Sequence, residues 1–478
     1  MKKILCFTLL FMSASPLLAA EVAGQIGYMS GALVAQRTDG TIRVMAPKSQ
    51  VQEGDVLVTS KDGYAQVKMN DGTMMTMRPD SNLKIEAYQY KKEAPQADNA
   101  VFRLLKGGFR TVTGLIGKRG NPDAYKLRAA TSTIGIRGTD FTTRLCNDKD
   151  CQDSSAKPQP PVVQPVGRVM LLQGEMAAKD AAGKVRKLLL GSPVYEGDTL
   201  NTNIKTNAVV AFRDESRITL QESSSFFVEK FKYDKAAPEK EGAVLRLLKG
   251  SVRVVTGLIG RVNHDNYKFG VAGATIGIRG TGFDAWCNGG CARSSERANL
   301  AQLDSGETRL DVPVGMLAEN TDFPNPGATQ DNPLDGAGVY VWSGAVVFVT
   351  PGASFDVALQ QAAIISRSTG KPVPIFVIPK SIIENGAPRP DSIPVDFNKE
   401  FGSGEAGGAG LYVTVHDGQV ILTQGGNSLN LGSGENGFAN DQFLMRLATP
   451  PAFLTGDTNH QFNGGTGGNA NGCTITGQ

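Results

Sequence analysis

Histidine, tryptophan and net charge are all scarce in this chain. Its 478 residues include 3 His and 2 Trp, and 49 Lys and Arg face 46 Asp and Glu, which leaves a formal net charge of +3. This balance excludes a basic nucleic-acid-binding protein, which needs clustered positive charge, and an acidic disordered tail protein. Three histidines also argue against a histidine-based metalloenzyme. We therefore expect no nucleic-acid partner.

Catalytic motifs are missing as well. The sequence holds no GxSxG or HExxH motif and no paired histidine and carboxylate, and His416 lies in TVHDG, which is typical of a hairpin turn. An enzyme site needs a nucleophile, a base and an orienting group together. We therefore expect no catalytic residue, no cofactor and no bound metal, and we favour a protein that is not an enzyme.

Long hydrophobic runs are absent after the first residues. Lys2 and Lys3 precede the apolar run Ile4–Met12, and small residues follow it. This layout is typical of a cleavable secretory signal, which we place at residues 1–20 with cleavage near Ala20. A bilayer span needs about 20 apolar residues, and no stretch supplies them. The sequence predicts a periplasmic or exported protein with no transmembrane span.

Cysteine is rare, and most of it occurs in two close pairs: Cys146 with Cys151, and Cys287 with Cys291. In an exported protein such pairs favour local disulfides. The alternative for the first pair is a metal site with Asp148 and Asp150 as further ligands, but the second pair, CNGGC, offers none. Cys473 is left over, either as a free thiol or as an intermolecular link.

Glycine, by contrast, is abundant at 57 residues, and many glycines belong to an internal repeat. The blocks EGD, RLLKG and VTGLIG each recur 143 residues further on, starting at Glu53 and Glu196, Arg103 and Arg246, and Val112 and Val255. The motif TIGIRGT recurs at Thr133 and Thr275, 142 residues apart. A register kept over this distance indicates a duplicated module.

The repeat and the composition together divide the chain into segments. We expect a first module at 21–152, a proline-rich linker at 153–165 and a second module at 166–292. After these we expect a polar loop at 293–335, completing β-strands at 336–455, and a flexible glycine- and asparagine-rich tail at 456–478.

Both modules are expected to be all-β, with short strands joined by tight turns. Asp39-Gly40 and Asn70-Asp71-Gly72 are hairpin signals, and Val67 and Met69 alternate with polar residues. Residues 353–366 are ambiguous between helix and strand. Residues 372–379, PVPIFVIP, predict an edge strand, because proline cannot donate to a central ladder.

The motif TIGIRGTDF predicts a β-bulge. Ile134 and Ile136 would face one side of a strand, but Phe141 lies five residues after Ile136 and so falls on the opposite side by simple alternation. A bulge at Gly138 would restore the parity, and the second copy repeats the pattern. The signature positions are Ile136, Arg137, Gly138, Thr139 and Phe141 in the first copy, and Ile278, Arg279, Gly280, Thr281 and Phe283 in the second.

The arginine of this motif has two interpretations. Arg137 and Arg279 would project to the face opposite the isoleucines. In the structural interpretation, which we favour, they form fixed ion pairs or carbonyl clamps, with Asp55 and Asp198 as the candidate acids. In the functional interpretation they contact a carboxylate or sulfate of a ligand.

The order of these motifs resembles the FecR domain. A glycine-rich first strand, the EGD turn, the NDG hairpin, RLLKG, TIGIRGTDF and a close cysteine pair follow one another along the chain, and most of them recur in the second copy. In this family a strand such as GLYVRVYDG follows the cysteines. Here GLYVTVHDGQVIL starts at Gly410, and a weaker version, GVYVWSGAVVF, starts at Gly338. We suspect that each core borrows one of these pieces, which would join the modules in a single packed body.

The resemblance implies an all-β fold, a twisted sandwich or short β-helix with C-terminal hairpin segments, and a role outside the cytoplasm. The family is named for the periplasmic part of the ferric-citrate transport regulator. That regulator also has a membrane-spanning helix and a cytoplasmic segment that acts on a sigma factor. We identify neither in this sequence, so we do not expect iron signalling.

The expected function is therefore binding or scaffolding in the cell envelope, without catalysis, through a protein, peptidoglycan or another polysaccharide. A secreted or surface-exposed structural protein is the alternative, and a sensor component of a signalling or transport system is a remoter one. Tyr340 and Trp342 are candidate ring platforms for a sugar, although half-buried sheet residues are the commoner role for both.

Overall fold

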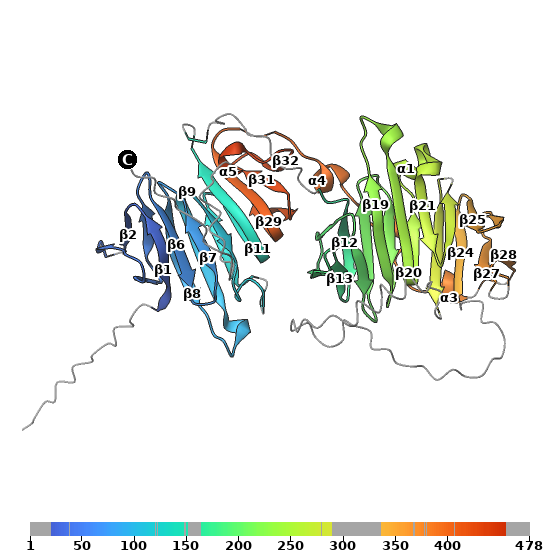
Figure 1. The fold of residues 1–478 in the computed structure, drawn as a ribbon, viewed down its shortest axis with the longest axis horizontal. Helices are drawn as coiled ribbons and strands as arrows, with labels where there is room; N and C mark the ends of the chain where they lie inside the picture. Colours follow the sequence, from blue (N-terminus) through green and yellow to red (C-terminus); the bar gives the residue numbers. More distant parts are fainter. Residues whose placement is uncertain are drawn as a thin grey trace, which may run out of the picture.

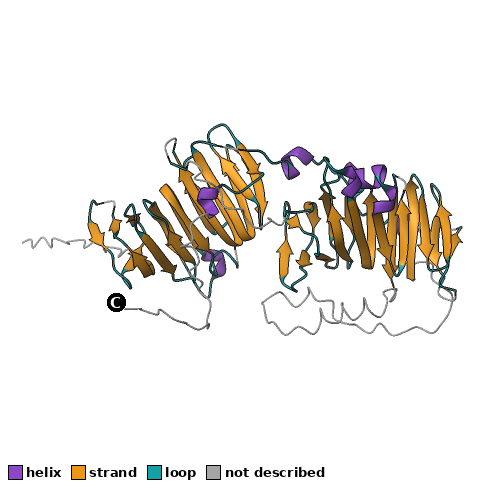
Figure 2. Cartoon of the chain, turned by 45° about the horizontal axis from the view of Figure 1, so that its top comes forward, coloured by secondary structure: helices purple, strands orange, loops and turns teal. Residues whose placement is uncertain are grey.

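The computed structural model describes residues 21–151, 164–288 and 336–455, apart from positions 38, 120, 122, 148–149, 279, 367–368, 377, 379 and 406. Almost every element is a β-strand, and the strands form two bodies that follow each other along the molecule, as Figure 1 and Figure 2 show. The all-β fold is confirmed. Within the described ranges, no helix is long and apolar enough to cross a membrane. The expected signal peptide and C-terminal tail lie outside these ranges.

The first body, module 1, is a 15-stranded sheet that folds over a single core. Its strands alternate core-facing and outward residues, and in Tyr64–Met69 it is Ala65, Val67 and Met69 that are buried. The N-terminal strands are β1 Val22–Ser30, β2 Leu33–Gln36, β3 Ile42–Val44, β4 Gln50–Gln52, β5 Val56–Thr59, β6 Tyr64–Met69, β7 Met74–Met77, β8 Asn82–Gln89, β9 Asn99–Val112, β10 Tyr125–Ala129 and β11 Ser132–Cys146.

The second body, module 2, is a 17-stranded sheet folded in the same way over its own core. Its strands are β12 Gly167–Gln173, β13 Met176–Lys179, β14 Val185–Leu188, β15 Pro193–Val194, β16 Thr199–Thr202, β17 Asn207–Phe212, β18 Arg217–Leu220, β19 Ser225–Lys232, β20 Gly242–Val255, β21 Tyr267–Val271, β22 Ala274–Ile278, β23 Gly282–Asn288, β24 Gly336–Ser343, β25 Val346–Thr350, β26 Ala353–Val357, β27 Ala362–Ile365 and β28 Pro372–Ile375.

The ambiguous segment 353–366 forms two strands, β26 and β27, and not a helix. Gln360, with φ of 61°, makes the turn between them, and a left-handed residue of this kind ends a helix. The predicted edge strand is β28, which is the last strand of its sheet. The helices are short: η1 Pro95–Ala97, η2 Pro238–Lys240, α1 Leu258–Val262, η3 His264–Asn266, α3 Lys380–Ile383, η4 Pro390–Ser392, α4 Phe397–Phe401 and α5 Ala452–Thr455.

Module 1 is completed by strands that follow module 2 in the sequence. β11 pairs antiparallel with β29, Gly410–Gln424, from Ser132 opposite Gln424 to Cys146 opposite Gly410. β30 Asn427–Gly432, β31 Asn436–Ala439 and β32 Leu444–Leu447 extend the same sheet. In module 2, β24 pairs with β23 and β25 with β22. Module 2 is therefore inserted into module 1, and each core takes one of the two similar tail pieces.

The single packed body suspected from the sequence is not observed. The buried apolar side chains of module 1 and module 2 form two separate clusters. The modules meet through polar contacts at a junction. The guanidinium of Arg168, which is fully buried, donates to Glu435 and to the main-chain oxygen of Glu400. The Tyr195 hydroxyl donates to the Ser433 oxygen at 3.0 Å, so hydrogen bonds fix one module against the other.

The predicted bulge is present in module 1. The pairing of β11 with β29 shifts register between Arg137 and Asp140, and Gly138 has φ of 56°. As a result Ile134, Ile136 and Phe141 all point into the core. In module 2, Gly280 has φ of 65°, and Ile278 and Phe283 are buried in the same way. The glycine is needed at this place because a positive φ strains other residues.

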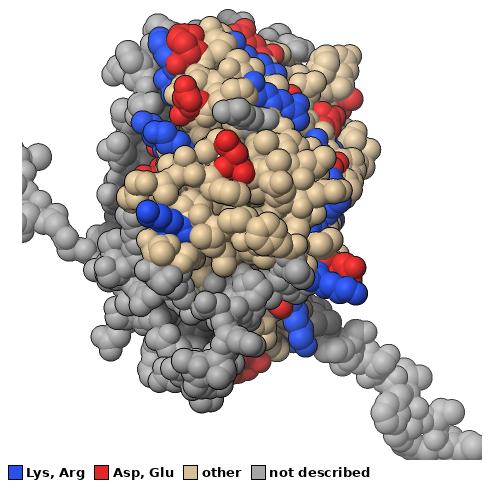
Figure 3. All heavy atoms as spheres, turned by 90° about the vertical axis from the view of Figure 1, so that its right-hand side faces the viewer, with Lys and Arg blue, Asp and Glu red and all other residues tan. Residues whose placement is uncertain are grey.

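The free end of module 2 carries no region of one charge. Figure 3 shows this end, with lysine, arginine, aspartate and glutamate scattered between wide uncharged areas. This distribution agrees with the near-neutral composition of the chain. A search for a ligand site therefore has to look for local arrangements of charge within one module.

Candidate functional site

A groove lies on the outer surface of module 1, across β10, β11 and β29, with a cavity volume of about 300 Å³. We call it the Arg137 groove. Its lining residues are Asp123, Lys126, Arg128, Thr133, Gly135, Ile136, Arg137, Ile421 and Thr423. The groove thus contains the arginine of the signature motif.

Strand register places these side chains together. On β11, Thr133, Gly135 and Arg137 alternate outward, opposite the buried isoleucines. Gly135 lies between Lys126 of β10 and Ile421 of β29. A Cβ atom at Gly135 would meet its nearest neighbour, the Ile421 oxygen, only at 3.9 Å. The missing side chain therefore forms the floor of the groove and leaves room for a ligand.

The charges of the groove favour an anion. Lys126, Arg128 and Arg137 face a single acid, Asp123. Burial lowers the pKa of Arg137, and the carboxylate of Asp123 acts in the opposite direction. The Nε atom of Arg137 is buried and donates to no acceptor among the described residues. A carboxylate or sulfate would provide one, because a guanidinium binds such oxygens in pairs.

Arg128 contributes less than its position suggests. Its Nη1 atom lies 3.1 Å from Glu86, and Glu86 also accepts a hydrogen bond from Arg103. These arginines lower the pKa of Glu86, although burial opposes the shift. Arg128 is therefore partly neutralised within the sheet. Lys126 and Arg137 remain the main cations available to a ligand.

The predicted partner of Arg137 was wrong. Asp55 is fully buried and pairs with Arg43 and Arg37, the latter at 3.5 Å. Asp55 also accepts a hydrogen bond from the Gln52 main-chain nitrogen, which holds it in its own turn. The sequence did contain a usable signal, since Arg43 recurs at the same distance along the chain as Asp55.

The second copy repeats this arrangement. Asp198 accepts from Arg186 Nη1 at 2.8 Å, so its pairing with Arg279 was not supported either. Arg279 itself lies outside the described residues. The pairing of both buried acids with hairpin arginines explains why the motif arginine of module 1 is left for another role.

The threonine of the signature motif is structural. Thr139 Oγ1 donates to the Gln419 oxygen at 2.8 Å and so ties β11 to β29. In module 2, Thr281 Oγ1 donates to the Ala345 oxygen at the same distance and ties the motif to the start of β25. Each module thus uses its signature threonine to hold its own tail piece.

Module 2 has changed the groove. Gly270 stands where module 1 has Arg128, since β21 pairs with β22 as β10 pairs with β11. Val347 and Val349 stand where module 1 has Ile421 and Thr423. The corresponding surface of module 2 therefore has fewer polar groups. Of the two copies, module 1 carries the better candidate site.

The two aromatic candidates lie on β24 of module 2 and are half-buried. The Trp342 ring is covered by the Arg389 guanidinium, 4.1 Å from its centroid, and its Nε1 donates to Asp284 at 3.2 Å. Gly282 lies against the same ring, since a Cβ there would approach it to 2.4 Å. Trp342 is thus engaged within its module, and we do not retain it as a sugar platform. Tyr340 stands one alternation before it on the same strand.

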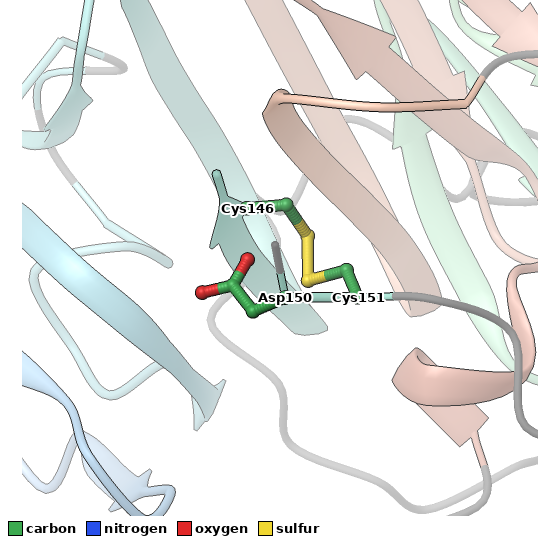
Figure 4. A group of neighbouring side chains, drawn as sticks. All are labelled: Cys146, Asp150 and Cys151. Carbon is green, nitrogen blue, oxygen red and sulfur yellow. A yellow bond between two sulfur atoms is a disulfide. The ribbon is translucent and has the colours of Figure 1, made fainter. Parts of the chain in front are cut away.

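One of the two expected disulfides lies within the described residues. Cys146, at the end of β11, is bonded to Cys151, as Figure 4 shows. Asp150 lies beside this bond, and its carboxylate is within 4.8 Å of both sulfur atoms. Because the disulfide uses both thiolates, the alternative metal site is not supported in this state, and Asp148 lies outside the described residues. Cys287 is buried at the end of β23, while Cys291 and Cys473 also lie outside.

Comparison with known proteins gives one family. The model of the family described as FecR protein matches residues 55–155 and 198–312. No curated protein and no solved structure matches the chain. The two matched segments coincide with the two copies of the internal repeat. The chain therefore carries two FecR domains in tandem and belongs, through them, to the FecR family.

Proposed function

We propose that this protein is exported and acts in the cell envelope as a non-enzymatic binding or scaffolding protein. The FecR match and the amino-terminal pattern of residues 1–20 support the location. The observation that carries the binding role is the Arg137 groove, where a half-buried guanidinium has an unpaired nitrogen beside an open floor. The ligand would present a carboxylate or sulfate to Arg137 and Lys126.

Peptidoglycan is the ligand that we favour, because its peptide stems carry free carboxylates. A strand of polymer could lie along a groove that crosses three β-strands. The secreted structural protein is the second candidate, but no described feature supports it over binding. A groove of this kind needs no catalytic group, in keeping with the absence of one from the sequence.

The test is co-sedimentation of the full mature chain with insoluble peptidoglycan. The double variant Lys126→Met, Arg137→Met should bind at least about tenfold more weakly, since a lost charge-assisted pair corresponds to about 1.5–3 kcal/mol. The matched control is Lys268→Met, at the position of Lys126 in module 2. Equal binding of the double variant, or equal loss in the control, would refute the role of the groove.

A second arm separates charge from polymer shape. Peptidoglycan whose free carboxyl groups have been amidated should lose binding to the wild-type chain. If amidation has no effect while an acidic envelope protein binds, the partner is a protein. If the untreated polymer never sediments the chain, peptidoglycan is excluded as the ligand.

A further inference from the structure

Module 2 binds a segment of its own chain across one outer face. Residues 380–393, which we call the strap, cross β18 and β20 on the side opposite the core. Thr219 Oγ1 donates to the Pro388 oxygen at 2.8 Å, and Arg253 Nη1 donates to the Ala387 oxygen at 2.9 Å. Arg217 Nη1 donates to the Ile393 oxygen at 3.0 Å. The face thus recognises an extended chain by its main-chain oxygens.

The binding arginine of this face is held rigidly. Arg253 forms a two-point ion pair with Asp284, at 2.8 and 2.9 Å, and Asp284 also accepts from Trp342. Arg389 of the strap then stacks on Trp342. Beneath the strap, only 9% of the Arg253 side chain and 5% of the Asp284 side chain are exposed. Main-chain recognition, one ion pair and one stacked ring therefore hold the strap.

Module 1 has the same face with most of the same groups. Thr76 and Arg110 are opposite each other on β7 and β9, as Thr219 and Arg253 are on β18 and β20. Arg110 forms a two-point ion pair with Asp140, at 2.9 and 2.7 Å. This pair leaves no local pattern in the sequence, because its arginine and acid lie 30 residues apart.

This face is more accessible in module 1. The exposed fractions of the Arg110 and Asp140 side chains are 30% and 19%, several times those of the module 2 pair. His416, which takes the place of Trp342, is exposed and lies 2.8 Å from Thr142 Oγ1. The helix α5 covers the far end, where Arg78 Nη1 donates to the Phe453 oxygen. Among the described residues, no counterpart of the strap crosses Thr76 and His416.

We propose that this face of module 1, defined by Thr76, Arg110, Asp140 and His416, binds an extended, proline-containing segment of a partner protein. The chemistry of the occupant follows from the strap, whose central residues are NGAPRPDSI. Prolines keep such a segment extended and lower the entropy lost on binding. Main-chain oxygens of the segment would accept from Thr76 and Arg110, and His416 would take the position of the stacking ring.

This face is independent of the Arg137 groove, which lies across β10 and the other half of β11. The groove selects a negative charge, whereas this face selects main-chain oxygens. Loss of one binding activity should leave the other in place. The two proposals can therefore fail separately.

The test uses a labelled peptide with the sequence of residues 384–396 and the full mature chain, with fluorescence anisotropy as the readout. We expect saturable binding that weakens about tenfold in Thr76→Val, which keeps the shape of the side chain but removes its donor. Arg110→Met should weaken binding at least as much. A scrambled peptide of the same composition is the control, and the melting temperature of each variant checks that it is folded.

Three results would overturn the proposal. The first is equal binding of the scrambled peptide, or binding that Thr76→Val leaves unchanged. The second is binding that appears only when the chain is shortened to end at Thr455, which would make residues 456–478 the occupant. The third is a concentration-dependent dimer that competes with the peptide, which would make a second copy the occupant.

Discussion

Asp71 in module 1 and Asp214 in module 2 occupy the same buried position after the sixth strand of each module. Asp71 accepts from the Tyr88 hydroxyl at 3.1 Å and from Thr73 Oγ1 at 2.8 Å. Asp214 keeps the equivalent partner, Ser216, but Phe231 stands in place of the tyrosine. Its Oδ2 atom is buried without a hydrogen-bond partner among the described residues, and burial raises the pKa of Asp214 to about 6.

The difference shows that the copies have been put to different uses. Module 2 has gained apolar packing, since Phe231 stacks on Phe212 with centroids 5.3 Å apart. Its outer face is covered by the strap, and Gly270 has removed one cation from its version of the groove. Module 1 keeps its polar partners in the core and its polar faces at the surface. We therefore assign ligand binding to module 1 and a bracing role to module 2.

The largest expected effect comes from removing the tail strands of one module only. A chain that ends at Gly402 keeps every strand of module 2 but loses β29–β32. Module 1 should then unfold, because β11 loses its partner along its whole length. Scanning calorimetry should show that the transition of module 1 has disappeared while that of module 2 remains. Two intact transitions in the shortened chain would contradict the nested arrangement.

The next effect is the pH dependence of module 2. The folded state raises the pKa of Asp214 from 3.8 to about 6, so it binds more protons than the unfolded state between these values. The contribution of Asp214 to stability is therefore greatest below about pH 4 and is lost as the pH rises to about 6. The loss is about 3 kcal/mol at most, because raising a pKa by one corresponds to about 1.4 kcal/mol.

Denaturant unfolding of the wild-type chain and of Asp214→Asn at several pH values measures this contribution. The difference between the two free energies of unfolding should change over that range and stay constant above about pH 7. Other carboxylates cancel in this difference. A difference independent of pH would mean that Asp214 is not the responsible group.

Exchanging one hydroxyl between the modules should give a smaller effect. Phe231→Tyr offers Asp214 the partner that Tyr88 gives Asp71, and should stabilise module 2 at neutral pH by about 1 kcal/mol. Tyr88→Phe should destabilise module 1 by about 1–3 kcal/mol, because it leaves a buried acceptor with fewer donors. Changes of the same sign in both variants would argue against the comparison.

The smallest effect is expected at an exposed ion pair that only module 1 has. Lys106 Nζ lies 2.7 Å from Asp80, and Ser223 stands at the position of Asp80 in module 2. Because both side chains are about half exposed, Lys106→Met should change the free energy of unfolding by less than about 1 kcal/mol. The matched variant Lys249→Met should change it by no more. A large loss in the first variant would show a role beyond the pair.

The sequence was informative where the constraint was local or repeated. The bulge at Gly138 followed from the parity of three apolar residues, and the strands followed from alternation and turn glycines. The duplicated tail pieces at Gly338 and Gly410 already suggested that each core takes one. The order of pairing was not predictable in the same way, because β11 meets its partner strand about 270 residues later.

Other features depend on tertiary contacts that leave no local pattern. The pairing of Asp55 with Arg43 displaced the predicted partner of Arg137, although both residues recur in the repeat. Nothing in the sequence of residues 380–393 indicates that they cross β18 and β20. The ambiguity at 353–366 was settled by pairing of β26 with β25, which local propensity does not encode.

The central claim is that module 1 carries the binding surface and module 2 does not. Hydrogen–deuterium exchange of the full mature chain, with and without soluble peptidoglycan fragments that retain their carboxylates, tests it most directly. We predict slower exchange in residues 123–137 and 419–424 and no change in residues 265–278 and 346–350. Protection confined to module 2, or equal in the two modules, would contradict the assignment.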